Sequence, residues 1–158
     1  MRRMFLVMVL AVACSVALWA QAPSDPMFGT WRLNVEKSTF SPGPGPKSEI
    51  ARMEYIPNGM KTTTEAVNAQ GVATRAETTA MFDGKEYEQK REGVPTGATF
   101  AYTRIDSRTH EFVTRFKGKI TVTRRSVVSA DGKTRTATVT GTDTQGRTVR
   151  NVQVYERQ

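Results

Sequence analysis

Turn signals recur along this chain at nearly even intervals, and this spacing limits the fold more than any other feature. Successive signals lie roughly 11 to 14 residues apart, the interval typical of an all-β sandwich or barrel. A residue–glycine pair between β-forming runs indicates a hairpin, because glycine reaches positive φ without steric cost. The intervening segments are too short for helical crossovers, so neighbouring strands should run antiparallel. The signals are Asn58-Gly59, Gln70-Gly71, Asp83-Gly84, the Gly93–Gly97 stretch, Asp106-Ser107, Lys117-Gly118, Asp131-Gly132 and Gln145-Gly146.

The first 22 residues have the three parts of a secretory signal peptide. Arg2 and Arg3 form a positive start, an apolar run follows, and Ala20-Gln21-Ala22 supplies a small-residue end. We therefore expect a signal peptide over residues 1–22 and one domain over 23–158, exported to the periplasm or outside of a bacterium. Cleavage after Ala20 competes with cleavage after Ala22, because proline at position 23 disfavours the later cut.

Cys14 leaves a second possibility open within this leader. Leu10-Ala11-Val12-Ala13-Cys14 resembles the lipobox of bacterial lipoproteins, in which the cysteine carries a lipid anchor. Apolar residues continue beyond Cys14 to Trp19, so the cysteine lies inside the apolar run and we favour cleavage without a lipid anchor. The remaining chain then has no cysteine and must be stabilised by its core alone.

The composition beyond residue 22 favours strands over helices. Leu33 is the only leucine there, against 22 threonines, whose branched Cβ suits a pleated strand. The apolar content is low for a packed sandwich, which favours a barrel with a partly polar lumen. We therefore predict an all-β fold, a single antiparallel up-and-down β-barrel of about 8–10 strands. The expected strands are Gly29–Leu33, Lys47–Ile56, Met60–Val67, Val72–Met81, Lys85–Glu88, Thr99–Ile105, Thr109–Phe116, Lys119–Val128, Thr134–Thr142 and Thr148–Glu156.

The start of the first expected strand resembles a known barrel family. Gly29-Thr30-Trp31 matches the G-x-W motif of lipocalins and their calycin relatives, at the position where they carry it. The resemblance implies that Trp31 closes the barrel floor and packs against an arginine of the last strand, with Arg157 the first candidate and Arg150 the second. The chain also resembles small exported bacterial proteins with G-T-W-x-L-N near the start, a group of uncharacterised activity.

Other features of the chain depart from these families. The second lipocalin motif, T-D-Y, is missing, and a strand number near ten is more similar to fatty-acid-binding barrels. Those proteins carry an R-x-Y pair for a ligand carboxylate and a two-helix lid. This chain has no R-x-Y near its end, and the proline loop Ser41–Pro46 replaces the lid, as a spacer or as a cover of one barrel mouth.

Catalytic and metal-binding signals are sparse. His110 is the only histidine, so no cluster of histidines can hold a metal ion, and the mature chain offers no cysteine nucleophile. The carboxylates do not form a pair of the kind that glycosidases use. We expect no enzyme activity, no catalytic residue, no metal and no cofactor.

Alternation places a candidate ligand site on two neighbouring strands. Residues two apart point to one face, and the Asp106-Ser107 turn joins the strands, so one inner wall should carry both sets of side chains. Ile120 and Val122 are expected to continue this face in the next strand. An arginine beside aromatic rings suits an anionic amphiphile, with Arg104 as the polar anchor. The predicted ligand-binding residues are Phe100, Tyr102, Arg104, Phe112 and Phe116.

Charge points to a soluble basic surface. The formal net charge is +8, and the basic residues are spread along the chain without the concentrated stripe that nucleic-acid binding needs. The sequence thus favours an exported, non-enzymatic barrel that binds a small apolar or anionic amphiphilic molecule. The alternative is a closed, filled barrel that acts through its loops as an envelope interaction or inhibitor module. The size of the lumen distinguishes the two, and the oligomeric state stays open.

Overall fold

The computed structural model describes residues 25–88 and 95–158, and these form an all-β fold of ten antiparallel strands. The predicted fold class, an up-and-down barrel of this strand number, is confirmed. The expected signal peptide, residues 1–22, lies outside the described residues. The strands are β1 (Gly29–Thr39), β2 (Ser48–Ile56), β3 (Gly59–Val67), β4 (Ala73–Met81), β5 (Tyr87–Glu88), β6 (Ala98–Arg104), β7 (Thr109–Phe116), β8 (Lys119–Val128), β9 (Thr134–Thr142) and β10 (Thr148–Arg157).

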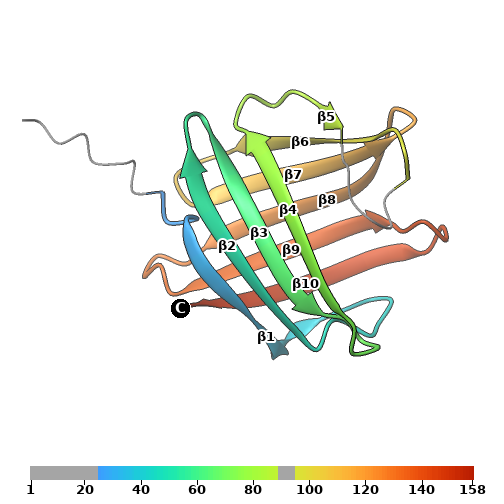
Figure 1. Ribbon diagram of the computed structural model, residues 1–158, viewed down its shortest axis with the longest axis horizontal. Coiled ribbons are helices and arrows are strands. Elements are labelled where there is room, and N and C mark those ends of the chain that lie inside the picture. The colour runs from blue at the N-terminus through green and yellow to red at the C-terminus, as the bar shows by residue number, and fades with distance from the viewer. Residues whose placement is uncertain (1–24, 89–94) are drawn as a thin grey trace, which may run out of the picture.

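The strands form a simple meander that curls until its first and last strands pair. The sheet order is β4-β3-β2-β1-β10-β9-β8-β7-β6-β5, so every neighbour is also a sequence neighbour except the β1–β10 pair. In Figure 1, β2, β3 and β4 cross in front of β6 to β10, and the chain ends beside β1. The two sheet edges, β4 and β5, leave the barrel nearly closed rather than fully closed.

Two strands differ from the sequence prediction because of local irregularities. β1 continues to Thr39, beyond the expected end at Leu33, with a break in its pairing to β10 between Asn34 and Thr39. A bulge in the β7–β8 ladder at Thr114 and Arg115 turns Ile120 outward, where it is 59% exposed. The expectation that Ile120 and Val122 share the inner face was therefore wrong, because a bulge reverses the alternation.

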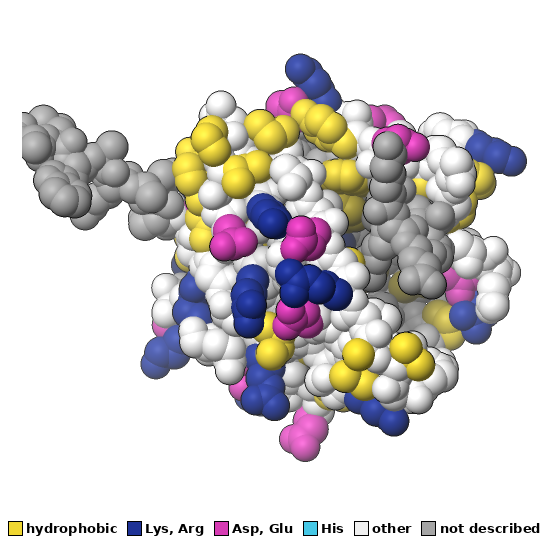
Figure 2. Space-filling view, in the orientation of Figure 1, with side chains coloured by type: hydrophobic (Ala, Val, Ile, Leu, Met, Phe, Trp, Pro, Cys, Tyr) yellow, Lys and Arg dark blue, Asp and Glu magenta, His cyan; other side chains and the backbone are white. Residues whose placement is uncertain are grey.

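The outer surface of the front strands carries mixed charges. Lys61 and Glu77 form one ion pair across β3 and β4, and Arg75 bridges Glu65 and Glu77. Figure 2 shows basic and acidic side chains interspersed over this face. The buried apolar side chains form one cluster inside the barrel that includes Trp31 of β1 and Tyr155 of β10. The core therefore lies toward the end of the barrel where β1 begins and β10 ends.

Candidate ligand-binding cavity

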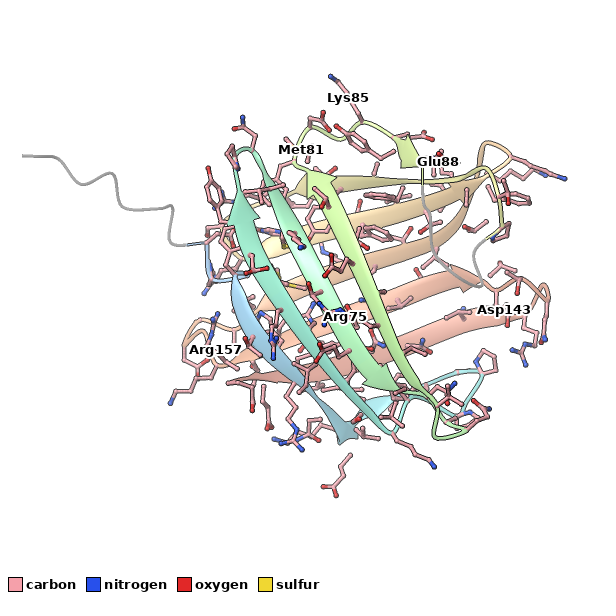
Figure 3. The ribbon with its side chains drawn as sticks, viewed as in Figure 1. Arg75, Met81, Lys85, Glu88, Asp143 and Arg157 are labelled. Carbon is pink, nitrogen blue, oxygen red and sulfur yellow. The ribbon has the colours of Figure 1, made fainter. Side chains whose placement is uncertain are left out.

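The barrel encloses a cavity of about 690 Å³. Its wall is mixed, with methionines and aromatic rings beside threonines and two arginines. One end reaches Pro95 and the turn between β9 and β10, where Thr144 and Gly146 are exposed. Figure 3 shows Asp143 of this turn and Arg157 far apart, near opposite ends of the β9–β10 hairpin.

The other end of the barrel is closed by the segment before β1. The Trp31 indole nitrogen donates to the Met27 carbonyl at 2.8 Å, and Trp31 and Met27 are fully buried. Arg157 donates to the carbonyls of Phe28 at 2.8 Å, Gly132 at 2.7 Å, and Pro26. Its guanidinium carbon lies 4.3 Å from the centre of the Trp31 ring. Arg157 of the last strand thus contacts the segment before β1, Trp31 and the turn between β8 and β9.

A chain of buried polar groups runs from this closing segment into the cavity wall. Asp25 is 5% exposed and accepts a hydrogen bond from the Met27 backbone at 2.8 Å, and its Oδ2 lies 3.0 Å from His110 Nε2. The other ring nitrogen of His110, Nδ1, lies 3.1 Å from the Tyr102 hydroxyl. His110 and Tyr102 both line the cavity. The chain therefore connects a carboxylate outside the lumen with a hydroxyl in its wall.

The predicted aromatic residues lie together on β6 and β7. Tyr102 pairs in register with Phe112, and both line the cavity with Phe116. Phe100 is 4% exposed and stacks on Phe112 with ring centres 5.2 Å apart, but does not itself line the cavity. Three of the four predicted aromatics thus reach the lumen, and Phe100 supports one of them.

Arg104 faces a different partner from the one expected. Its Nε lies 3.2 Å from Asp25 Oδ2, its side chain is 36% exposed, and it is not among the residues that line the cavity. Register explains this placement, because Arg104 is the last residue of β6, opposite His110, at the closed end of the barrel. The positive charge of Arg104, which the sequence placed in the lumen, is therefore paired with Asp25 at the closed end of the barrel.

Two other arginines, Arg124 of β8 and Arg135 of β9, line the cavity instead. Arg135 is 1% exposed, and its Nε and Nη2 have no hydrogen-bond partner among the described residues. Its guanidinium carbon lies 4.0 Å from the ring centre of Tyr155 and 5.7 Å from that of Trp31. The rings hold the cation but accept no conventional hydrogen bond, so two buried donors are left unsatisfied.

Burial dominates the ionisation of the groups around the lumen. It lowers the pKa of Arg135, since the charged guanidinium is removed from water. It also lowers the pKa of His110, although the Asp25 carboxylate acts in the opposite direction. Burial raises the pKa of Tyr155 to about 12 and raises that of Tyr102 above its ordinary value. Both tyrosines are thus neutral at ordinary pH.

Strand alternation in the sequence contains a signal for the two cavity arginines. In the sequence, Thr134, Thr136, Thr138 and Thr140 form a threonine row, the pattern of a surface-like strand face. Arg135 shares the opposite face with Ala137 and Val139, so alternation alone points it inward. Arg124 lies two residues after Val122, so alternation gives both the same face, and both line the cavity. The Asp25 carboxylate had no such signal, because it precedes the first strand.

Within residues 25–88 and 95–158, no group of His, Cys, Asp or Glu side chains gathers as a metal site would require. The same residues contain no helix that is long and apolar enough to cross a membrane.

Comparison with known proteins identifies the fold but no family. No family model matches the chain, and no curated protein matches its sequence. A fatty acid binding protein of Schistosoma mansoni, solved with arachidonic acid, superposes with a TM-score of 0.63 at 14% identity, covering 87% of this chain and 99% of that one. A zebrafish ileal bile acid-binding protein, complexed with cholic acid, gives 0.52 at 10% identity, covering 84% and 99%. At such low identity, the likeness shows that this chain has the calycin-type barrel fold.

Proposed function

We propose that this protein is an exported, non-catalytic carrier of an anionic amphiphile, held in the barrel lumen. The observation that carries the proposal is the Arg135 side chain. A buried guanidinium with two unsatisfied nitrogens costs free energy that an apolar side chain would avoid. A carboxylate or phosphate in the lumen would offset this cost once the Arg135 side chain turns toward it. Arg124 supplies a second positive charge on the same wall.

The size and lining of the cavity support a ligand with a long apolar part. A volume of about 690 Å³ lies within the usual range of small-molecule sites, roughly 300–1,000 Å³. Met53, Met60, Phe112 and Phe116 offer apolar surface to such a chain. A barrel filled by its own side chains, as in the alternative interaction module, would not leave this space. The two similar structures were solved in complex with arachidonic acid and with cholic acid, and both of these ligands are anionic amphiphiles, which supports a ligand of this class.

Titration calorimetry with dodecanoate and 1-dodecanol tests the proposal. The two probes share an apolar chain, but only dodecanoate carries an anion. Wild-type protein should bind dodecanoate more tightly, and Arg135→Met should weaken dodecanoate binding roughly ten- to a hundred-fold, as expected for a lost charge-assisted hydrogen bond. Arg135→Met should leave dodecanol binding nearly unchanged. Arg150→Gln, at an exposed arginine of β10, is the charge-matched control and should bind both probes like the wild type.

The same variant separates a binding role from a structural one. Methionine keeps the apolar stem of Arg135 and removes the unsatisfied donors. The free energy of unfolding of the ligand-free variant should therefore be unchanged or raised, by up to ~4 kcal/mol. A large loss of stability with unchanged dodecanoate binding would mean that Arg135 stabilises the fold and does not bind the ligand. The carrier proposal would then lose the observation on which it rests.

A further inference from the structure

The hydrogen-bond chain at the barrel floor has a direction, and this direction determines what the cavity wall can bind there. Asp25 Oδ1 accepts a hydrogen bond from the Met27 backbone, while Oδ2 lies 3.0 Å from His110 Nε2 and forms an ion pair with Arg104 Nε at 3.2 Å. A carboxylate with three such neighbours is an acceptor only. His110 must therefore carry its proton on Nε2, the nitrogen that faces Asp25.

This tautomer leaves the second ring nitrogen of His110 without a proton. The His110 ring is neutral because burial disfavours its charged form, so Nδ1 can only accept a hydrogen bond. The Tyr102 hydroxyl, 3.1 Å away, must be the donor in this contact. Its single proton is then committed to His110, and the oxygen has only lone pairs left for another partner.

The Tyr102 oxygen keeps lone pairs for a second hydrogen-bond partner. Tyr102 lines the cavity, and no described residue other than His110 hydrogen-bonds to its hydroxyl. We propose that this oxygen is an acceptor subsite, which recognises a hydroxyl group on the bound amphiphile. This inference rests on the proposed carrier function and narrows its ligand to a hydroxylated anion.

The surrounding charges favour a neutral donor and place it near the anionic end of the ligand. Arg135, Asp25 and Arg124 all act electrostatically on Tyr102, so a ligand ammonium would meet two positive charges and one negative charge here. Tyr102, Phe112 and Arg124 occupy matching positions on three adjacent strands, which puts the outer two Cα atoms roughly 10 Å apart. Side chains reaching inward from both positions can contact one small polar head that carries an anion and a hydroxyl a few carbons apart.

A set of three probes tests the subsite: dodecanoate, 3-hydroxydodecanoate and 3-methoxydodecanoate. The methoxy group can accept a hydrogen bond but cannot donate one. Wild-type protein should bind the hydroxy acid roughly three- to ten-fold more tightly than dodecanoate, the value of a neutral hydrogen bond, and more tightly than the methoxy acid. Tyr102→Phe should abolish this preference, so that the hydroxy acid binds no more tightly than dodecanoate. Tyr87→Phe, whose hydroxyl bonds Asp83 outside the cavity, is the matched control and should retain the preference.

A second variant keeps the test decisive if Tyr102→Phe does not fold. Asp25→Asn offers His110 an amide donor, which favours the opposite tautomer and turns the Tyr102 proton toward the lumen. The ratio of the affinity for 3-hydroxydodecanoate to that for 3-methoxydodecanoate should then decrease. A wild type without hydroxyl preference, or a preference that survives both substitutions, overturns the subsite while dodecanoate binding keeps the carrier proposal intact. Failure of all three probes to bind the wild type overturns both proposals.

Discussion

The guanidinium of Arg157 lies over the indole of Trp31, with 4.3 Å between the guanidinium carbon and the ring centre, and these residues are direct partners in the β1–β10 pairing. They come from the first and last strands of a ten-stranded meander. Their contact therefore lies at the seam where the sheet closes on itself. Arg157 also donates to carbonyls of the closing segment and of the β8–β9 turn, so one side chain joins the three parts of the barrel floor.

Loss of the indole should strongly destabilise the barrel. Trp31 is fully buried, and Trp31→Ala should lower the free energy of unfolding by about 3–5 kcal/mol, as large aromatic truncations in cores do. Urea denaturation followed by circular dichroism measures the change. Ile120→Ala, at a residue that is 59% exposed, serves as the control and should cost less than about 1 kcal/mol. A Trp31→Ala protein as stable as the wild type would contradict a structural role for this seam.

Arg104 should matter little for ligand charge, although it was the anchor that sequence alternation predicted. Its guanidinium is paired with Asp25 and lies outside the cavity lining. Arg104→Gln should therefore change dodecanoate affinity less than about three-fold, whereas Arg124→Gln, in the cavity wall, should weaken it more. Parallel titrations of the two variants measure this difference. An Arg104→Gln effect as large as that of Arg135→Met would return the anchor role to Arg104.

The stability of the protein should fall below neutral pH partly because of His110. Burial lowers the pKa of this histidine in the folded state, so the unfolded chain binds the proton first as pH decreases. The contribution of His110 is therefore complete above its unfolded pKa of about 6.5 and is lost progressively below it. Between pH 7.5 and pH 5, the melting temperature of the wild type should fall further than that of His110→Gln. Equal falls would show that His110 does not titrate with the expected sign.

Export should remove the leader without adding lipid. The basic start, apolar run and small-residue end of residues 1–22 predict cleavage after Ala20 or Ala22. Intact-mass spectrometry of the protein recovered from a bacterial periplasm should give the mass of one of these two chains. A mature chain that begins at an acylated Cys14 would contradict the prediction and place the barrel on a membrane by a lipid anchor.

Much of the architecture could be predicted because it depends on local rules. Turns such as Asn58-Gly59 and Asp131-Gly132 specify hairpins, and a run of hairpins can only make an antiparallel meander. The break in β1 and the bulge that turns Ile120 outward could not be predicted in this way. Both depend on the partner strand, and no single-strand pattern contains that information.

The candidate site was predictable only in part, for a related reason. Alternation placed Tyr102, Phe112 and Phe116 on one wall, and it could have placed Arg135 inward with Ala137 and Val139. Alternation gives a face, however, and not a height along the barrel. The height decides that Arg104 meets Asp25 at the floor, while Arg124 and Arg135 face the lumen.

The Nε–H resonance of Arg135 reports directly whether an anion in the lumen binds the unsatisfied donors of this side chain. In a ¹H–¹⁵N spectrum of arginine Nε groups, dodecanoate should shift the Arg135 signal downfield, since its Nε gains an acceptor. The same ligand should barely move the Arg104 signal, whose Nε already faces Asp25 at 3.2 Å, and 1-dodecanol should move neither. Binding of dodecanoate with an unchanged Arg135 signal, or with a shift confined to Arg104, would show that Arg135 does not bind the ligand anion.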